Sequence, residues 1–362
     1  AEAVKKVVDI PVMTVGWITP ELGERILQEG KADFITMGRR LIADPELPNK
    51  AFSGRLDDIR PCIACYRCLD GVLFERKGIK CSVNAAAGKE QECKIKAAEK
   101  SKKVLVIGAG PAGMEAARVA ALRGHEVLLY ERNRRPGGQL LLASVPPYKG
   151  NIERLTDYLV TQIHKLGVEV ELGKEATPAL IEEIKPDVVI LATGVVPFIP
   201  QIRGIDKVDF VTAEGVLAGK VEIGDKVVII GGEVVGCETA EFLVEKGKKV
   251  TIVEVRPTMA MEKIPVFREL FLDRLEAKGV AMLSGVKDEE LNEKGLALTT
   301  EEGERQFIEA DSIVIAAGAK PNSKLSEMLK GKVPELHLIG DCVEPRNILE
   351  AIASGFRIGC AV

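Results

Sequence analysis

The chain has 362 residues, which is enough for two or three domains and a sizeable core. Its 46% apolar and 29% charged residues are typical of a globular protein, and a formal charge of −4 gives no reason to expect a nucleic-acid partner. No basic segment followed by an apolar run opens the sequence, and the uncharged stretches are too short to span a bilayer, so we expect neither secretion nor a membrane partner.

The first residues indicate a single β-α-β unit. Residues 10–16 form an apolar run of strand length, residues 20–30 have helical spacing after Thr19 as N-cap, and residues 33–37 form a second strand. Such units belong to sheets with several parallel strands, because two strands cannot cover both faces. The far end, residues 346–362, has helical spacing without a cap. We therefore expect the chain to be a piece of a longer protein.

Four cysteines are the most specific signal in the chain. Cys62, Cys65 and Cys68 are each separated by two residues, and Cys81 follows after twelve more. Four thiolates at this spacing suit a 4Fe-4S cluster, whereas zinc usually takes two separated Cys-x-x-Cys pairs and remains the alternative. Eight cysteines in all make no disulfide scaffold, so we expect a reducing, cytoplasmic compartment. Cys93 lies on the polar linker that follows and is given no role.

After that linker the chain contains an internal repeat. KVLVIGAGPAGMEAARVAALRGHEVLLYER begins at Lys103, and KVVIIGGEVVGCETAEFLVEKGKKVTIVEV begins at Lys226. Each copy reads as strand, glycine-rich turn, helix and strand, and each second strand ends in an acidic residue at the same offset from the first glycine. The equal offsets predict two α/β folds of the Rossmann-like, dinucleotide-binding type, the second inserted in the first.

The first glycine-rich turn has the spacing of a dinucleotide-binding motif. Gly108 allows the tight turn, Gly110 lets a pyrophosphate approach the backbone, and Gly113 allows close packing of helix on strand. The phosphates would lie on free N–H groups at the positive end of the helix dipole. Glu131 is placed to accept hydrogen bonds from a ribose. Because strand, helix and acidic residue all agree, we predict that this turn binds a dinucleotide.

The second turn departs from the pattern at one position. Glu233 stands where the middle glycine belongs, so its β-carbon narrows the approach of the phosphates and its carboxylate repels them. The alternative is that the side chain turns to solvent and binding survives. Glu254, at the end of the second strand, favours the free 2′-hydroxyl of NADH. Because Arg256 lies close by, NADPH remains an alternative to NADH.

Further small-residue turns complete a resemblance to thioredoxin-reductase-like and glutathione-reductase-like flavoproteins. They are Gly138-Gln139, Thr193-Gly194 and Gly340-Asp341. The resemblance implies that the first motif holds FAD and the second NAD(P)H, and that the final helix, from about Asn347, points its N-terminus at the flavin. The residues implied for FAD are Gly108, Gly110, Pro111, Ala112, Gly113, Glu131, Arg132, Gly138, Gln139, Thr193, Gly194, Gly340 and Asp341; those for the nicotinamide cofactor are Gly231, Gly232, Gly236 and Glu254.

A disulfide reductase of that kind would need a redox cysteine pair. No Cys-x-x-Cys stands between Lys103 and Val362, and the three cysteines in that range are isolated in the sequence. We interpret them as small apolar residues of the interior. The sequence therefore argues against a plain disulfide reductase.

The order of these parts resembles the multidomain branch of the old-yellow-enzyme flavoproteins, which includes 2,4-dienoyl-CoA reductase, 2-enoate reductases and trimethylamine dehydrogenase. The resemblance covers essentially all 362 residues. It implies that residues 1–58 are the last two βα units of an FMN-binding TIM barrel, with Gly16, Gly38 and Arg39 holding the FMN phosphate. The other implied regions are an iron–sulfur segment and linker at 59–100, a discontinuous FAD domain at 101–219 and 333–362, and an inserted NAD(P)H domain at 220–332.

The resemblance also implies a relay of electrons. NADH would reduce FAD, FAD would pass single electrons to the 4Fe-4S cluster, and the cluster would pass them to FMN, which reduces an activated C=C bond of an enoate or enoyl-CoA. The small-molecule substrate would bind the barrel strands that this sequence lacks, so no catalytic residue is assigned. We expect FMN in the full-length protein and not in these residues alone.

Two alternatives fit the same sequence. In a protein like trimethylamine dehydrogenase, electrons would leave to a protein acceptor and the nucleotide domains would be partly vestigial, which Glu233 favours. In the other, these residues are an electron-transfer piece that is inactive alone. A homo-oligomer is also left open.

Overall fold

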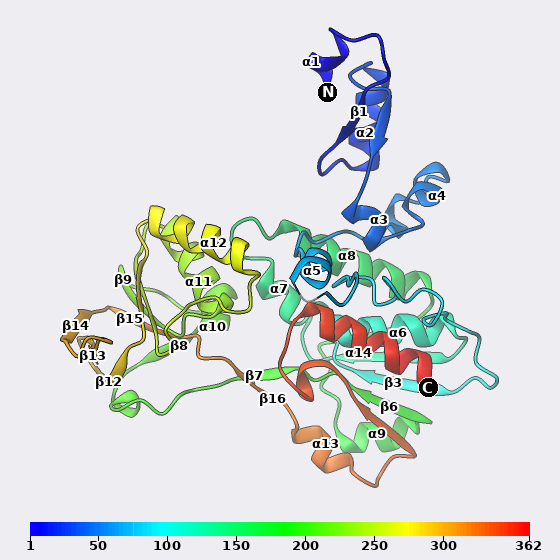
Figure 1. Cartoon of the computed structure of the whole chain (residues 1–362). Helices are drawn as coiled ribbons and strands as arrows, with labels where there is room; N and C mark the ends of the chain where they lie inside the picture. Colours follow the sequence, from blue (N-terminus) through cyan, green and yellow to red (C-terminus); the bar gives the residue numbers. More distant parts are fainter. Residues whose placement is uncertain (75) are drawn as a thin grey trace.

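The computed structural model describes residues 1–74 and 76–362. Two five-stranded parallel sheets with their helices lie side by side, and a small N-terminal segment projects beyond them (Figure 1). Both sheets are built from strands rich in Val, Leu and Ile that are buried on both faces, as parallel strands between helices require. Within the described part of the chain, no helix combines the length and apolarity needed to cross a bilayer.

The N-terminal segment contains the expected β-α-β unit. Strands β1 and β2 pair in parallel, Met13 opposite Phe34, and the Thr19 hydroxyl accepts a hydrogen bond from the Leu22 amide at 3.2 Å at the start of α2. Met13, Phe34 and Val15 are exposed, because a two-stranded sheet cannot cover its own faces. The elements are α1 (Glu2–Lys5), β1 (Met13–Val15), α2 (Pro20–Gln28), β2 (Phe34–Thr36), α3 (Arg39–Ala43), α4 (Leu47–Phe52), η1 (Leu56–Asp58), α5 (Arg67–Leu69) and the π-helical turn η2 (Asp70–Phe74).

The first sheet has the order β17-β6-β3-β4-β5. Helix α6 packs on this sheet and α14 packs on α6: a Cβ at Gly355 would collide with the Ala112 carbonyl oxygen, so glycine is needed where these helices meet. The elements are β3 (Lys103–Ile107), α6 (Pro111–Leu122), β4 (Glu126–Glu131), α7 (Gln139–Ala143), α8 (Gly150–Lys165), β5 (Glu169–Leu172), α9 (Pro178–Ile184), β6 (Val188–Leu191), α13 (Lys324–Leu329), β17 (Glu335–Leu338), η4 (Gly340–Cys342) and α14 (Ile348–Ala361).

The second sheet has the order β11-β10-β9-β15-β8, and a three-stranded antiparallel sheet, β12-β13-β14, packs beside it. The elements are η3 (Ile205–Lys207), β8 (Phe210–Thr212), α10 (Ala213–Leu217), β9 (Lys226–Ile230), α11 (Val234–Glu245), β10 (Lys249–Glu254), α12 (Pro265–Ala277), β11 (Ala281–Ser284), β12 (Lys287–Asn292), β13 (Gly295–Thr299), β14 (Arg305–Glu309) and β15 (Ser312–Ile315).

A two-stranded antiparallel ribbon joins the two sheets (Figure 1). It consists of β7 (Val195–Pro197) and β16 (Ala319–Pro321). The chain leaves the first sheet after β6, builds the second sheet, and returns through β16 so that β17 pairs with β6 in parallel. The α/β fold class with two parallel nucleotide-type sheets is confirmed; the four domain boundaries stay predictions.

Candidate cofactor and nucleotide site

The first glycine-rich turn contains glycines of two kinds. Gly108 has φ +108°, and a Cβ on it would collide with the Ala192 carbonyl oxygen; a Cβ on Gly113 would collide with the Gly108 carbonyl oxygen. Both are therefore required by the protein's own packing. Gly110 differs, because its φ of −77° suits any residue and, of the described residues beyond its chain neighbours, none places a heavy atom within 4 Å of a Cβ there. This open space lies where a pyrophosphate would approach.

Glu131 closes this turn from the end of β4. Its Oε2 accepts a hydrogen bond from the Ala109 amide at 2.8 Å, and its Oε1 accepts one from the Asn133 amide at 2.8 Å. The residue is 6% exposed, so these N–H donors are what compensates the burial of a carboxylate. The acid that sequence spacing assigned to the ribose thus also fixes the shape of the turn.

The second turn repeats this geometry. Gly231 has φ +112°, and a Cβ on Gly236 would collide with the Gly231 carbonyl oxygen, as in the first copy. Glu254, 5% exposed, accepts hydrogen bonds from the Gly232 amide at 2.7 Å and the Arg256 amide at 2.9 Å. Glu233 has φ −73° and ψ 180°, nearly the backbone conformation of Gly110. Its side chain therefore enters the space that the first turn leaves open.

The Glu233 carboxylate is held inside the site. The Arg256 Nη2 lies 2.7 Å from its Oε1, an ion pair without the angles of a hydrogen bond. Both carboxylate oxygens are shielded from solvent and have no hydrogen-bond partner among residues 1–74 and 76–362. The alternative in which this side chain turns to solvent is therefore wrong. Arg256, which sequence reasoning left open for a 2′-phosphate, pairs with Glu233 and, through Nε at 3.3 Å, with Glu254.

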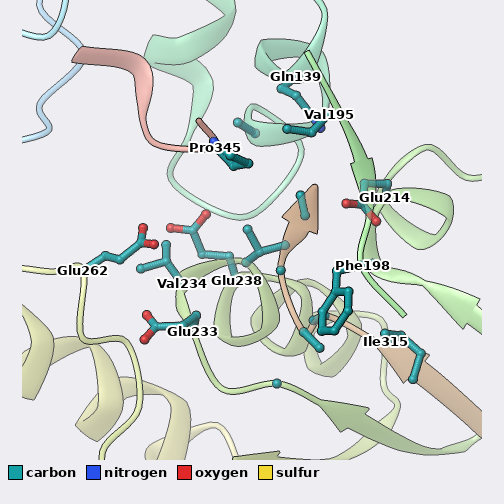
Figure 2. A pocket seen from close by; sticks show the side chains of 18 of the residues that line it. Gln139, Val195, Phe198, Glu214, Glu233, Val234, Glu238, Glu262, Ile315 and Pro345 are labelled. Atoms are coloured by element: carbon teal, nitrogen blue, oxygen red, sulfur yellow. The ribbon is translucent and has the colours of Figure 1, made fainter. Parts of the chain in front are cut away.

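A cavity of about 920 Å³ lies between the two halves of the molecule (Figure 2). Pro111, Gln139 and Asp341 line it from the first half, and Gly231 and Glu254 line it from the second. Its size is in the range of cofactor pockets. The cavity thus brings predicted FAD residues and predicted NAD(P)H residues to one place, although they are about a hundred residues apart in the sequence.

The C-terminal helix begins at this cavity. Asn347 and Ile348 line it, and the Asn347 side chain caps α14 by accepting a hydrogen bond from the Leu349 amide at 3.0 Å. The positive end of the helix dipole therefore lies at the cavity, where it favours negative charge. Burial raises the pKa of Asp341, opposed by a hydrogen bond that its Oδ1 accepts from the Arg346 amide at 3.1 Å.

Several cavity residues were missed by sequence reasoning. They are Glu238 and Glu262, which lie on the same side of the pocket as Glu233 in Figure 2, and Glu214 on the opposite side. Glu238 pairs with Lys149, which precedes α8 in the first half of the molecule. Burial raises the pKa of Glu262, and the charge of Glu233 adds to the effect. Glu238 is an acidic residue within a buried helix, and the sequence alone could have marked it as unusual. No spacing rule, however, predicts that it pairs with Lys149.

The remaining predicted FAD residues surround the first turn and the ribbon. A Cβ on Gly138 would lie 2.9 Å from the Gly110 Cα, and one on Gly340 would lie 2.9 Å from the Ala112 Cβ. The Thr193 hydroxyl donates a hydrogen bond to the Asn322 carbonyl oxygen at 2.9 Å, which links the chain segments beside the two strands of the ribbon. Gly194 follows Thr193 with φ +67°. Arg132 is exposed.

Cys62, Cys65, Cys68 and Cys81 line one small cavity. Burial raises the pKa of the Cys62 and Cys68 thiols and raises the pKa of Cys81 to about 11, while backbone N–H groups beside Cys62 and Cys81 act in the opposite direction. Cys65 Sγ is hydrogen-bonded to Ser82 Oγ at 3.2 Å. Four thiols that line one cavity are a donor set that suits an iron–sulfur cluster. Among the described residues, however, no three His, Cys, Asp or Glu side chains are grouped closely enough to hold a single metal ion, so the cluster stays a prediction.

The residues predicted for the FMN phosphate lie at the ends of β1 and β2. Gly16 has φ +128°, and Gly38 precedes α3; both are exposed. Arg39 lines the cysteine cavity, and its guanidinium lies over the rings of Tyr66 at 4.4 Å and Trp17 at 5.3 Å. The structure therefore connects Arg39 to the cysteine segment as well as to the strand end.

Two families match the sequence. Residues 102–355 match the pyridine nucleotide-disulphide oxidoreductase family, and residues 1–58 match the NADH:flavin oxidoreductase / NADH oxidase family. The first match alone covers more than half of the chain. The family's FAD- and NAD(P)H-binding fold is therefore present in residues 102–355.

Known relatives extend over both regions. An NADH oxidase of Thermoanaerobacter brockii is 44% identical over 99% of this chain and 56% of its own length. A cinnamate reductase of Clostridium sporogenes is 39% identical over 99% of this chain and 54% of its own. The solved complex of 2-naphthoyl-CoA reductase with 2-naphthoyl-CoA matches with a TM-score of 0.94 and 37% identity, over 99% of this chain and 55% of that one.

The chain thus spans about half the length of the curated relatives it matches. The two matched regions follow one another in the order that the sequence resemblance implies. The second region contains both nucleotide turns. The chain belongs to the NADH:flavin oxidoreductase group of multidomain flavoproteins, within which residues 102–355 form a pyridine nucleotide-disulphide oxidoreductase module.

Proposed function

We propose that this chain is the NADH-oxidising part of an ene-reductase, in which electrons pass from NADH to FAD, to a 4Fe-4S cluster and on to FMN. The observation that carries the proposal is the cavity between the two sheets, lined by Gln139 and Asp341 on one side and by Gly231 and Glu254 on the other. A hydride donor and a hydride acceptor must meet at one place, and this cavity offers such a place between two dinucleotide turns.

The first turn fits FAD. The open space at Gly110 accepts a pyrophosphate, the N-terminus of α6 begins there, and Glu131 lies at the end of the neighbouring strand. When bound, FAD would supply acceptance of a hydride and release of single electrons. Gln139, Asp341 and the N-terminus of α14 would orient the flavin at the cavity, and the helix dipole would favour negative charge on it.

The cysteine cavity supports a proposed cluster site between the N-terminal β-α-β unit and the two nucleotide folds. Its four thiols would be the ligands, Ser82 is hydrogen-bonded to one sulfur, and Arg39 places a positive charge beside them. A bound cluster would carry one electron at a time, which suits a place between two flavins. The same segment touches the second half of the molecule, since Tyr66 lies 4.2 Å from the ring of Phe267.

The substrate is proposed from the relatives. A cinnamate reductase and a 2-naphthoyl-CoA reductase are both similar to this chain, and both names describe reduction of a conjugated acid or acyl-CoA. We therefore propose an activated C=C bond of an enoate or enoyl-CoA as the electron acceptor of the whole protein. The substrate would bind barrel strands that these residues do not include, and FMN would be held there as well.

The test is anaerobic reduction of the FAD-loaded chain by NADH. Bleaching of the flavin absorbance and turnover with an artificial acceptor are expected. A flavin that binds but is not bleached by NADH would contradict the proposal and favour the alternative in which electrons enter from a substrate and leave to a protein acceptor.

The cluster is tested separately by metal analysis of anaerobically prepared chain. About four irons per chain are expected from four thiolate ligands. Cys81→Ser should lower the iron content, whereas Cys93→Ser, a matched change outside the cysteine cavity, should leave it unchanged. Zinc without iron would contradict the cluster assignment.

A further inference from the structure

Glu289 is a carboxylate of the cavity that neither turn motif contains. It lies on β12, and it lines the same cavity as Glu254 and Arg256. The pairing of β12 with β13 shifts register between Lys287 and Glu290, and Asp288 has φ +51°, which is strained for a residue other than glycine. Irregularities of this kind re-aim a side chain and are frequent beside functional sites.

One carboxylate oxygen of Glu289 has no hydrogen-bond partner in the described part of the chain, whereas both oxygens of Glu254 have one. This Glu289 oxygen, Oε1, is also shielded from solvent. Both oxygens of Glu254, in contrast, are occupied by the N–H groups of Gly232 and Arg256. Burial raises the pKa of Glu289, and the charge of Glu254 adds to the rise, so the two carboxylates lie close enough to repel each other. A buried acceptor without a donor is costly unless a ligand supplies one.

We propose that Glu289 accepts a hydrogen bond from the adenosine ribose of NADH and, together with Glu254, excludes the 2′-phosphate of NADPH. This inference rests on the proposed binding of NADH at the second turn. The two ribose hydroxyls are donors, and Glu254 has little free acceptor capacity left. A 2′-phosphate carries no donor when ionised and would bring its negative charge against two carboxylates.

Arg256 is the group that could have favoured NADPH. An arginine after the second strand accommodates a 2′-phosphate in some dinucleotide folds. Here its Nη2 is paired with Glu233 at 2.7 Å and its Nε with Glu254 at 3.3 Å. Arg256 is therefore paired with two carboxylates, and Glu289 adds a third carboxylate to the same cavity, so the charge of these four groups together is negative.

The test is calorimetric titration of the FAD-loaded chain with NAD⁺ and with NADP⁺, which do not reduce the flavin. The wild-type chain should bind NAD⁺ at least about a hundredfold more tightly than NADP⁺. Glu289→Gln should weaken NAD⁺ binding and strengthen NADP⁺ binding, so that the ratio of the two dissociation constants falls about tenfold, the effect of removing one charge near a phosphate. Glu290→Gln is the matched control, because its carboxylate is on the same strand and faces Arg305.

Each outcome separates this inference from the proposed function. Equal wild-type affinities for the two nucleotides would overturn the inference while leaving nucleotide binding intact. An unchanged ratio in Glu289→Gln, or the same fall in Glu290→Gln, would also overturn it. A wild-type chain that holds FAD but binds neither nucleotide would overturn the inference and the proposed function together.

Discussion

The two glycine-rich turns have nearly the same backbone and differ in one side chain. The φ angles of Gly108 and Gly231 are +108° and +112°, and one backbone N–H of each turn donates a hydrogen bond to the acid that ends the next strand. The first turn leaves its middle position open, and the second fills it with the carboxylate of Glu233. The shape of the turn therefore comes from its outer glycines and its acid, whereas the middle residue decides how a phosphate is bound.

The largest expected effect comes from giving the first turn a side chain at its middle position. Gly110→Val places a branched side chain in the path of the pyrophosphate, so the ratio of FAD to protein should fall close to zero. The backbone at Gly110 tolerates any residue, so the fold should survive.

Gly150→Val is the control for this change. Gly150 begins α8, and a Cβ there also meets open space among the described residues. This variant should retain FAD. A normal flavin content in Gly110→Val, measured after denaturation, would show that the flavin binds elsewhere.

The next largest effect is expected from removing the acid that is hydrogen-bonded to each turn. Glu131→Ala and Glu254→Ala each leave buried N–H groups without an acceptor, at about 1–3 kcal/mol for each group. Both variants should therefore show a similar fall in the thermal midpoint of unfolding. Glu131→Ala should also lose FAD, and Glu254→Ala should lose affinity for NADH while keeping FAD. If both variants lost the same cofactor, the two turns would not serve separate dinucleotides.

The turn geometry was predictable because it depends on local spacing. Gly108, Gly110 and Gly113 stand at fixed offsets from one another and from Glu131, and the structure places them in one turn. The parallel strands followed from buried runs such as residues 103–107. The order of the strands, with β17 returning to β6 from far along the chain, depends on long-range pairing that no local pattern encodes.

The electrostatics of the cavity were less predictable. The sequence placed Glu233 in the motif but could not show that Arg256 would pair with it, because the pair depends on how β10 ends beside α11. Glu289 comes from a different sheet and follows a backbone irregularity at Asp288. Lys149 and Glu238 are 89 residues apart and meet across the two halves of the molecule. Such contacts require the tertiary structure.

A smaller effect is expected from restoring glycine in the second turn. Glu233→Gly removes a carboxylate from the path of the phosphates, so NADH should bind about tenfold more tightly. This is the low end of what one charge near a phosphate costs, because Arg256 already offsets part of the charge of Glu233. The gain should be larger at low salt.

Glu233→Gln separates charge from size in this change. If repulsion dominates, Gln should recover most of the gain in affinity for NADH; if bulk dominates, only Gly should. Equal dissociation constants in the wild type and both variants, measured by calorimetry, would mean that a phosphate does not pass this position.

The smallest expected effect is on the pairing of Arg256 with Glu233. The Arg256 side chain is 53% exposed, and exposed ion pairs contribute about 0–1 kcal/mol, so Arg256→Ala should weaken NADH binding no more than about fivefold. The change should matter less in a Glu233→Gly background, because the carboxylate that Arg256 neutralises is then absent. A double-mutant cycle on the dissociation constant for NADH measures this coupling. Strictly additive effects would show that Arg256 acts on the nucleotide independently of Glu233, and the second turn would then depend on a phosphate-binding cation that the first turn lacks.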